Sequence, residues 1–137
     1  MLYFIFVGGS VATAAMTLFS LMVSLVFKQL YREPVLINLL LPQKITKYSV
    51  LGYLIHFAVG WILALVYYFL TIGGFALLSF QIGLIFGLIS GLLAIAAWMV
   101  FFKLSKHPPK INLTGYFLQL LLAHLIFGGT LAWVVMQ

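Results

Sequence analysis

Residues 113–136 read LTGYFLQLLLAHLIFGGTLAWVVM, a stretch that contains no Asp, Glu, Lys or Arg. A helix that crosses the hydrocarbon core of a bilayer needs ~20 mostly apolar residues, and this stretch is long enough. Further apolar runs lie at about residues 2–27, 48–70 and 78–102. These runs are continuously apolar rather than alternating, and backbone polar groups must be satisfied internally in lipid, so we expect helices and not a barrel. The sequence therefore predicts a single all-α domain over residues 1–137, an integral membrane four-helix bundle.

The overall composition excludes a water-soluble protein. Of the 137 residues, 66% are hydrophobic and 6% are charged, whereas a soluble domain carries about 25% charged residues. The chain has no cysteine, which excludes disulfides and thiolate metal sites. It has no Asp either, so a Ser-His-Asp set cannot form. We therefore expect no enzyme, no catalytic residue and no metal site.

The basic residues predict the orientation in the membrane. They lie in the two connections that follow the first and the third run, at Lys28, Arg32, Lys44, Lys47, Lys103, Lys106 and Lys110. Cytoplasmic loops are enriched in Lys and Arg, so both connections are expected in the cytoplasm and both termini outside. The N-terminus lacks the basic region of a signal peptide, which indicates a retained first span. These charges form no face on a folded domain, so the net charge of +6 predicts no nucleic-acid partner.

The first basic connection contains an apolar segment at about residues 34–42, bounded by Pro34 and Pro42. It is too short to span a membrane. Pro34 suits the first turn of a helix, and Glu33 just before it suits the positive end of the helix dipole. Two interpretations stay open: a short helix at the membrane interface, or a hydrophobic loop packed under the bundle.

The two halves of the chain resemble each other. At a shift of 68 positions, the second run aligns with the fourth and shares the pattern T-x-Y-x7-H-x3-G-x3-A. At a shift of 75, Gly8 and Ala12 meet Gly83 and Gly87 more weakly. Both halves would then be helical hairpins of the same orientation. We predict two tandem parallel repeats related by an axis along the membrane normal.

The repeat draws attention to His56 and His124. Each lies ten residues after a Thr at the span edge, or ~15 Å along a helix, and each is followed at i+4 by a glycine, Gly60 or Gly128. An ionisable residue in a span predicts a functional site. One hypothesis is a haem b whose iron binds both imidazoles, with the glycines making room for the macrocycle. The other is ordinary small-residue packing, with each His hydrogen-bonded across an interface. No Arg lies in a span to hold the propionates, which counts against haem.

Other polar groups lie on one helix face or deep in a span. The first run carries a hydroxyl stripe of Thr13, Thr17, Ser20 and Ser24 at spacings of 4, 3 and 4. It either packs a helix or hydrogen-bonds the second nitrogen of a bound His. Gln119 is expected to bond to another helix. In the third run the glycines at 83, 87 and 91 repeat every fourth position, which favours close helix packing in the bundle or in a homodimer.

The motif Gly9-Ser10-Val11-Ala12-Thr13-Ala14-Ala15-Met16-Thr17, together with His56-x3-Gly60-x3-Ala64-x2-Tyr67, resembles small bacterial inner-membrane proteins of the YagU type. The resemblance covers about half of the chain. It implies a bacterial inner membrane and carries no site residues.

Three functions remain open from the sequence. The first is a non-catalytic membrane protein that associates with itself or joins a larger complex and has a buried polar site around His56 and His124. The second is a bis-histidine haem b electron carrier or cytochrome subunit. The third is one protomer of a small symmetric transporter. Because no Asp or Glu lies in a span, a proton-coupled mechanism would have to use the histidines, which weighs against the third.

Overall fold

The chain forms a helical bundle whose long helices match the predicted spans. The computed structural model describes residues 1–41, 46–74 and 79–137. In these ranges there is no strand, and four helices are long and apolar enough to cross a membrane. The first begins as a π-helical turn, η1 (Phe4–Gly8), and continues as α1 (Gly9–Phe27); the others are α3 (Val50–Ile72), α4 (Phe80–Leu104) and α5 (Leu113–Val135). A short helix, α2 (Glu33–Leu40), lies between α1 and α3.

The predicted all-α four-helix membrane bundle is therefore confirmed, and the helix ends fall within two residues of the predicted spans wherever both are described. The predicted start of the third span at Leu78, the predicted end of the short segment at Pro42, and Lys44 lie outside the described residues.

Local chemistry explains where the helices begin and end. Three of them start after a side chain that accepts a backbone N–H of the first turn, as an N-cap does: Ser49 for α3, Ser79 for α4 and Asn112 for α5. Helix α1 ends at Lys28, whose φ of 51° is left-handed. That conformation turns the chain away from the helix axis.

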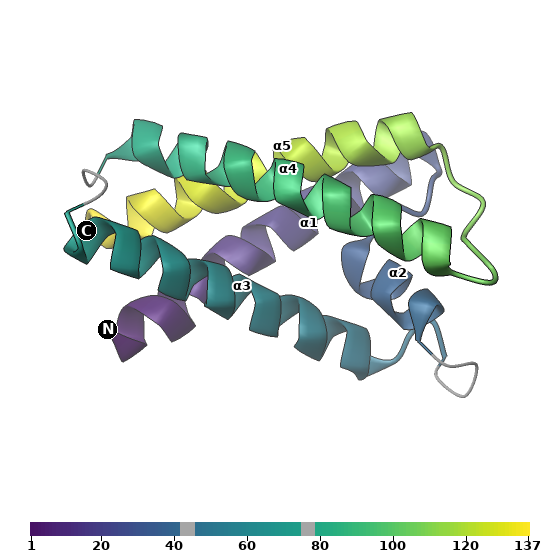
Figure 1. Ribbon diagram of the computed structural model, residues 1–137, viewed down its shortest axis with the longest axis horizontal. Helices are drawn as coiled ribbons and strands as arrows, with labels where there is room; N and C mark the ends of the chain where they lie inside the picture. Colours follow the sequence, from purple (N-terminus) through teal and green to yellow (C-terminus); the bar gives the residue numbers. More distant parts are fainter. Residues whose placement is uncertain (42–45, 75–78) are drawn as a thin grey trace.

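The long helices pack in the order α3, α1, α5, α4. Helix α4 lies against α5 along its length, α5 also packs against α1, and α1 packs against α3 (Figure 1). Among the described residues, α3 and α4 touch far less; one contact is between the rings of Tyr67 and Phe86, whose centroids are 5.1 Å apart. Both termini, the end of α3 and the start of α4 lie at one end of the bundle (Figure 1). Helix α2, the end of α1 and the end of α4 lie at the other end (Figure 1), which we call the basic end because Lys28, Arg32 and Lys103 lie there.

Glycines allow α4 and α5 to approach closely. A Cβ atom on Gly87 would overlap the backbone carbonyl of His124, and one on Gly128 would overlap backbone atoms of Gly83 and Gly87. Any larger residue at these positions would push the two backbones apart, as expected for small-residue packing in membranes.

Helix α2 packs under the bundle at the basic end. Val35 and Leu36 are at most 1% exposed. The segment is therefore a short helix, as the first interpretation predicts, but it packs under the bundle, as the second predicts. Asn38 ties α2 to the start of α3: its Nδ2 donates to the carbonyls of Lys47 (3.0 Å) and Ser49 (2.7 Å), and its Oδ1 accepts from the backbone N–H of Gly52 (2.8 Å). Helices α2 and α3 are therefore joined as one unit (Figure 1).

Candidate functional site

The hydroxyl stripe of α1 faces the interior of the bundle. Thr13 and Ser20 are buried, and each donates to the carbonyl four residues earlier, at Gly9 (2.7 Å) and Met16 (3.0 Å). Thr17 does the same with the carbonyl of Thr13 at 2.6 Å. Such bonds satisfy a hydroxyl within its own helix, so the stripe costs little in an apolar interior. The hydroxyl oxygens stay available as acceptors for groups on other helices.

His56 contacts this stripe from α3. Its Nε2 lies 3.0 Å from Oγ1 of Thr17, and the residue is 8% exposed. Thr17 already donates its proton to a carbonyl, so the bond is best satisfied when Nε2–H of His56 donates and Thr17 accepts. One turn further along α3, Gly60 faces the hydroxyl of Thr13. The α1–α3 interface thus consists of polar and small side chains.

His124 is satisfied differently, within its own helix. Its Nδ1 lies 2.9 Å from the carbonyl oxygen of Leu120, and its Cβ faces Gly91 of α4. Among the described residues, no hydrogen bond joins the two imidazoles to a common atom.

The residues present do not fit a haem between the two histidines. The space beside Gly60 is filled by Thr13, and the space beside Gly128 is filled by the backbone of α4. Both glycines therefore serve helix packing and leave no slot for a macrocycle. In addition, Nε2 of His56 is hydrogen-bonded to Thr17. These contacts therefore do not support a haem site at His56 and His124.

The most unusual feature of the interior is Glu33, which sequence analysis placed in a loop. After Lys28 the chain folds back, so the first residue of α2 lies between α1 and α5 and is 2% exposed. Nε2 of Gln119 donates to Oε1 of Glu33 at 3.1 Å, and Oγ of Ser20 lies 2.9 Å from the same oxygen. The one proton of Ser20 is therefore shared between Oε1 of Glu33 and the carbonyl of Met16. Nε2 of Gln119 also donates to Oγ of Ser20 at 2.5 Å. We call Ser20, Glu33 and Gln119 the carboxyl cluster.

The carboxyl cluster contains buried polar atoms without a partner. Among the described residues, Oε2 of Glu33 and Oε1 of Gln119 accept no hydrogen bond, and the hydroxyl of Tyr116, one turn before Gln119, is unpaired as well. Native proteins seldom leave such atoms unsatisfied, so each is a candidate to bind a water, a ligand or a proton.

The electrostatics of Glu33 are dominated by its burial. Burial raises the pKa of its carboxyl from 4.5 to about 7, although hydrogen bonds from its own backbone, Gln119 and Ser20 act in the opposite direction. All of these partners are neutral. The neighbouring guanidinium of Arg32 donates to the hydroxyl of Tyr53 on α3. The carboxyl therefore has no strong partner for its charged form and changes protonation near neutral pH.

The sequence singled out Ser20 and Gln119 but not Glu33. The structure brings Ser20 together with Gln119, Thr17 with His56, and Thr13 with Gly60. The sequence did contain an indication of Glu33. Ser20 and Gln119 are polar groups in spans without an assigned charged partner, and Glu33 is the only acidic residue in the chain.

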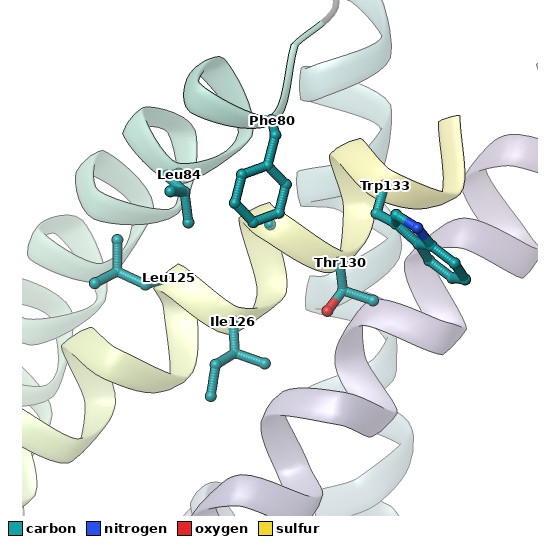
Figure 2. Close-up of a pocket in the computed structure, with 7 residues that line it drawn as sticks. Phe80, Leu84, Leu125, Ile126, Thr130 and Trp133 are labelled. Atoms are coloured by element: carbon teal, nitrogen blue, oxygen red, sulfur yellow. The ribbon is translucent and has the colours of Figure 1, made fainter. Parts of the chain in front are cut away.

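A separate groove lies on the outer surface between α4 and α5 (Figure 2). Phe80 and Leu84 of α4 line it from one side, and Leu125, Ile126 and Trp133 of α5 from the other. Its polar side-chain groups are the hydroxyl of Thr130 and the indole N–H of Trp133. Such an apolar, open surface is typical of the face that a membrane helix pair presents to lipid chains.

No family model, no curated protein and no solved structure matches this chain. The resemblance to YagU-type proteins stays a prediction, and function has to be argued from the residues themselves.

Proposed function

We propose that this multi-pass membrane protein is a non-catalytic transport protein that moves a small solute or ion and couples the movement to the carboxyl cluster. The observation that carries the proposal is the burial of Glu33 between α1 and α5. Ionisable groups inside membrane bundles are costly and mark ion pathways and proton relays. The main argument from the sequence against transport was the lack of an acidic residue in a span. Glu33 removes this argument, because α2 places its carboxyl inside the bundle.

The polar groups continue from the carboxyl cluster toward the middle of the bundle. Thr17 lies one turn from Ser20 on α1 and bonds His56 of α3. The polar groups around Glu33 and His56 thus share one face of α1. A continuous set of hydroxyl, carboxyl and imidazole groups is what a polar path through lipid requires.

Matching contacts in the two hairpins support a repeat. In each hairpin the helix that holds the histidine meets its partner at three successive turns. The facing pairs are Gly9 with Ala64, Thr13 with Gly60 and Thr17 with His56 in the first hairpin, and Gly83 with Ala132, Gly87 with Gly128 and Gly91 with His124 in the second. Residues of α1 correspond to residues of α4 at a shift of 74 positions, and residues of α3 to residues of α5 at a shift of 68. The shift between α1 and α4 is one residue less than the shift of 75 seen in the sequence. Internal repeats of this kind are common in transporters.

The proposed setting is the bacterial inner membrane, with both termini outside and the basic end in the cytoplasm. In the sequence, all seven basic residues follow the first or the third apolar run; of the described ones, Lys103 lies in the last turn of α4. The protein is small for a transporter, so we propose that it acts as a homodimer or within a larger membrane complex.

Electrophysiology on proteoliposomes fused to a solid-supported membrane tests the proposal. The probes are concentration jumps of amino acids, sugars, monovalent and divalent cations, and small organic cations and anions. We expect a transient current for at least one class, and its loss in Glu33→Gln. The matched control is Thr130→Val, which changes a polar side chain on the outer groove and should keep the current. Currents in Glu33→Gln equal to those of the unchanged protein would refute the role of the cluster. No current with any probe would favour an accessory subunit instead.

A further inference from the structure

The carboxyl cluster holds two acceptors that lack a donor. Gln119 and Glu33 are already joined by one hydrogen bond, from Nε2 to Oε1. The second oxygen of each group, Oε1 of Gln119 and Oε2 of Glu33, has no partner and is buried. An ionised carboxylate and an amide oxygen are both acceptors and cannot bond each other.

One proton added to Oε2 of Glu33 would give both this atom and Oε1 of Gln119 a hydrogen-bonding role. A protonated Oε2 is a donor, and the unpaired oxygen of Gln119 is the acceptor on the group to which Glu33 is already bonded. A carboxylic acid and an amide can then form a pair with two hydrogen bonds. We propose that Glu33 is a proton-binding site whose protonated form is recognised by Gln119, so that the ion coupled to transport is the proton. The inference rests on the proposed function for its use in transport, but proton binding itself is measurable without flux.

The groups that face Glu33 agree with a site for a proton. On α1 its partner is the neutral hydroxyl of Ser20, and on α5 the partners are Gln119 and the neighbouring phenol of Tyr116. In the turn before α2, Arg32 bonds the hydroxyl of Tyr53 on α3, and Tyr31 is buried against Tyr116. On α3, His56 reaches the same face of α1 through Thr17. Arg32 is the one permanently charged group in this set.

The transfer needs no further reactant. A proton from water forms the O–H bond at Oε2 of Glu33, and the carboxylate becomes a neutral acid. On release the O–H bond breaks, the electron pair stays on the carboxylate, and the proton returns to water. Such a change alters the charge of α2 by one unit at the point where it contacts α1 and α5.

The composition of the chain makes the test direct. Glu33 is its only acidic side chain, so labelling Glu with ¹³C at the side-chain carboxyl yields one protein signal without any need for assignment. The unchanged protein in nanodiscs is titrated by NMR, once in sodium buffer and once in choline buffer. We expect a midpoint near 7, not near 4.5, and the same midpoint in both buffers. Gln119 donates to Oε1, which favours the carboxylate, so recognition of the acid requires that its acceptor oxygen outweigh this bond. Gln119→Leu should then lower the midpoint, a raised midpoint would contradict the recognition, and the control Thr130→Val should leave the midpoint unchanged.

Two results would overturn the inference. One is a midpoint near 4.5, which is that of an ordinary carboxyl. The other is a signal that stays ionised at neutral pH in sodium but not in choline, which identifies a metal cation as the ligand. The titration tests the proton site, and the current measurement tests transport, so either proposal can be rejected without the other. A neutral midpoint without any current would reject transport and keep the proton site, and currents with an ordinary midpoint would do the reverse.

Discussion

Replacing Glu33 by Gln should remove the contribution of this carboxyl to the pH dependence of stability between pH 4.5 and 7. The folded state binds the proton of Glu33 more tightly than the unfolded state, because burial raises the pKa from 4.5 to about 7. Below pH 4.5 both states are protonated and the stabilisation is complete. As the pH rises, the unfolded chain ionises first, so the free energy of unfolding falls until the folded carboxyl has ionised near pH 7. One pKa unit corresponds to 1.36 kcal/mol, so the total loss is about 3 kcal/mol.

Equilibrium unfolding in mixed micelles, followed by circular dichroism at a series of pH values, measures this loss. Relative to Glu33→Gln, the unchanged protein should lose about 2.5 kcal/mol of stability between pH 5 and pH 8, because all other titrating groups cancel in this comparison. Gln retains the shape of the side chain and can still donate to Gln119. At pH 8 the variant should therefore be the more stable protein. A variant that is less stable than the unchanged protein at pH 8, or equal slopes in the two proteins, would refute the assignment of a neutral carboxyl.

Three further predictions concern the frame around the cluster. Asn38→Ala removes the hydrogen bonds that tie α2 to α3 and leaves the N–H of Gly52 unsatisfied. The free energy of unfolding should fall by about 2 kcal/mol in the same assay. An unchanged unfolding midpoint would contradict a stabilising role of Asn38. Gly87→Leu forces a side chain into the backbone of α5 and should cost about 3 kcal/mol, whereas Leu88→Ala, on the exposed side, should cost far less. A reporter fused after Gln137 should respond as extracytoplasmic, and a cytoplasmic signal would reverse the orientation.

The spans could be predicted from the sequence because each is a long run that lipid accepts only as a helix. The close packing of α4 on α5 was also predictable, since glycines at 83, 87 and 91 fall on one helix face. The surface against which these glycines pack could not be predicted. Whether those glycines meet another copy or another span depends on tertiary arrangement, and in this structure they meet Gly128 and His124 of α5.

The location of Glu33 could not be predicted from local sequence. A hydropathy pattern assigns Arg32 and Glu33 together to a polar loop, since adjacent charges look equally exposed. The structure separates them: the left-handed turn at Lys28 returns the chain to the bundle, where Glu33 faces Ser20 and Arg32 bonds Tyr53. That separation depends on contacts between residues far apart in the chain, above all the bond to Gln119.

The attachment of Glu33 suggests how its proton could control the bundle. Glu33 is carried by α2, which Asn38 joins to α3, whereas Ser20 and Gln119 belong to α1 and α5. The carboxyl cluster therefore bridges α2 and the α1–α5 pair, in addition to the direct packing of α3 on α1. A negative charge at this bridge is poorly solvated and favours separation, whereas a neutral acid favours docking. Solvent accessibility of the carboxyl cluster should thus rise with pH.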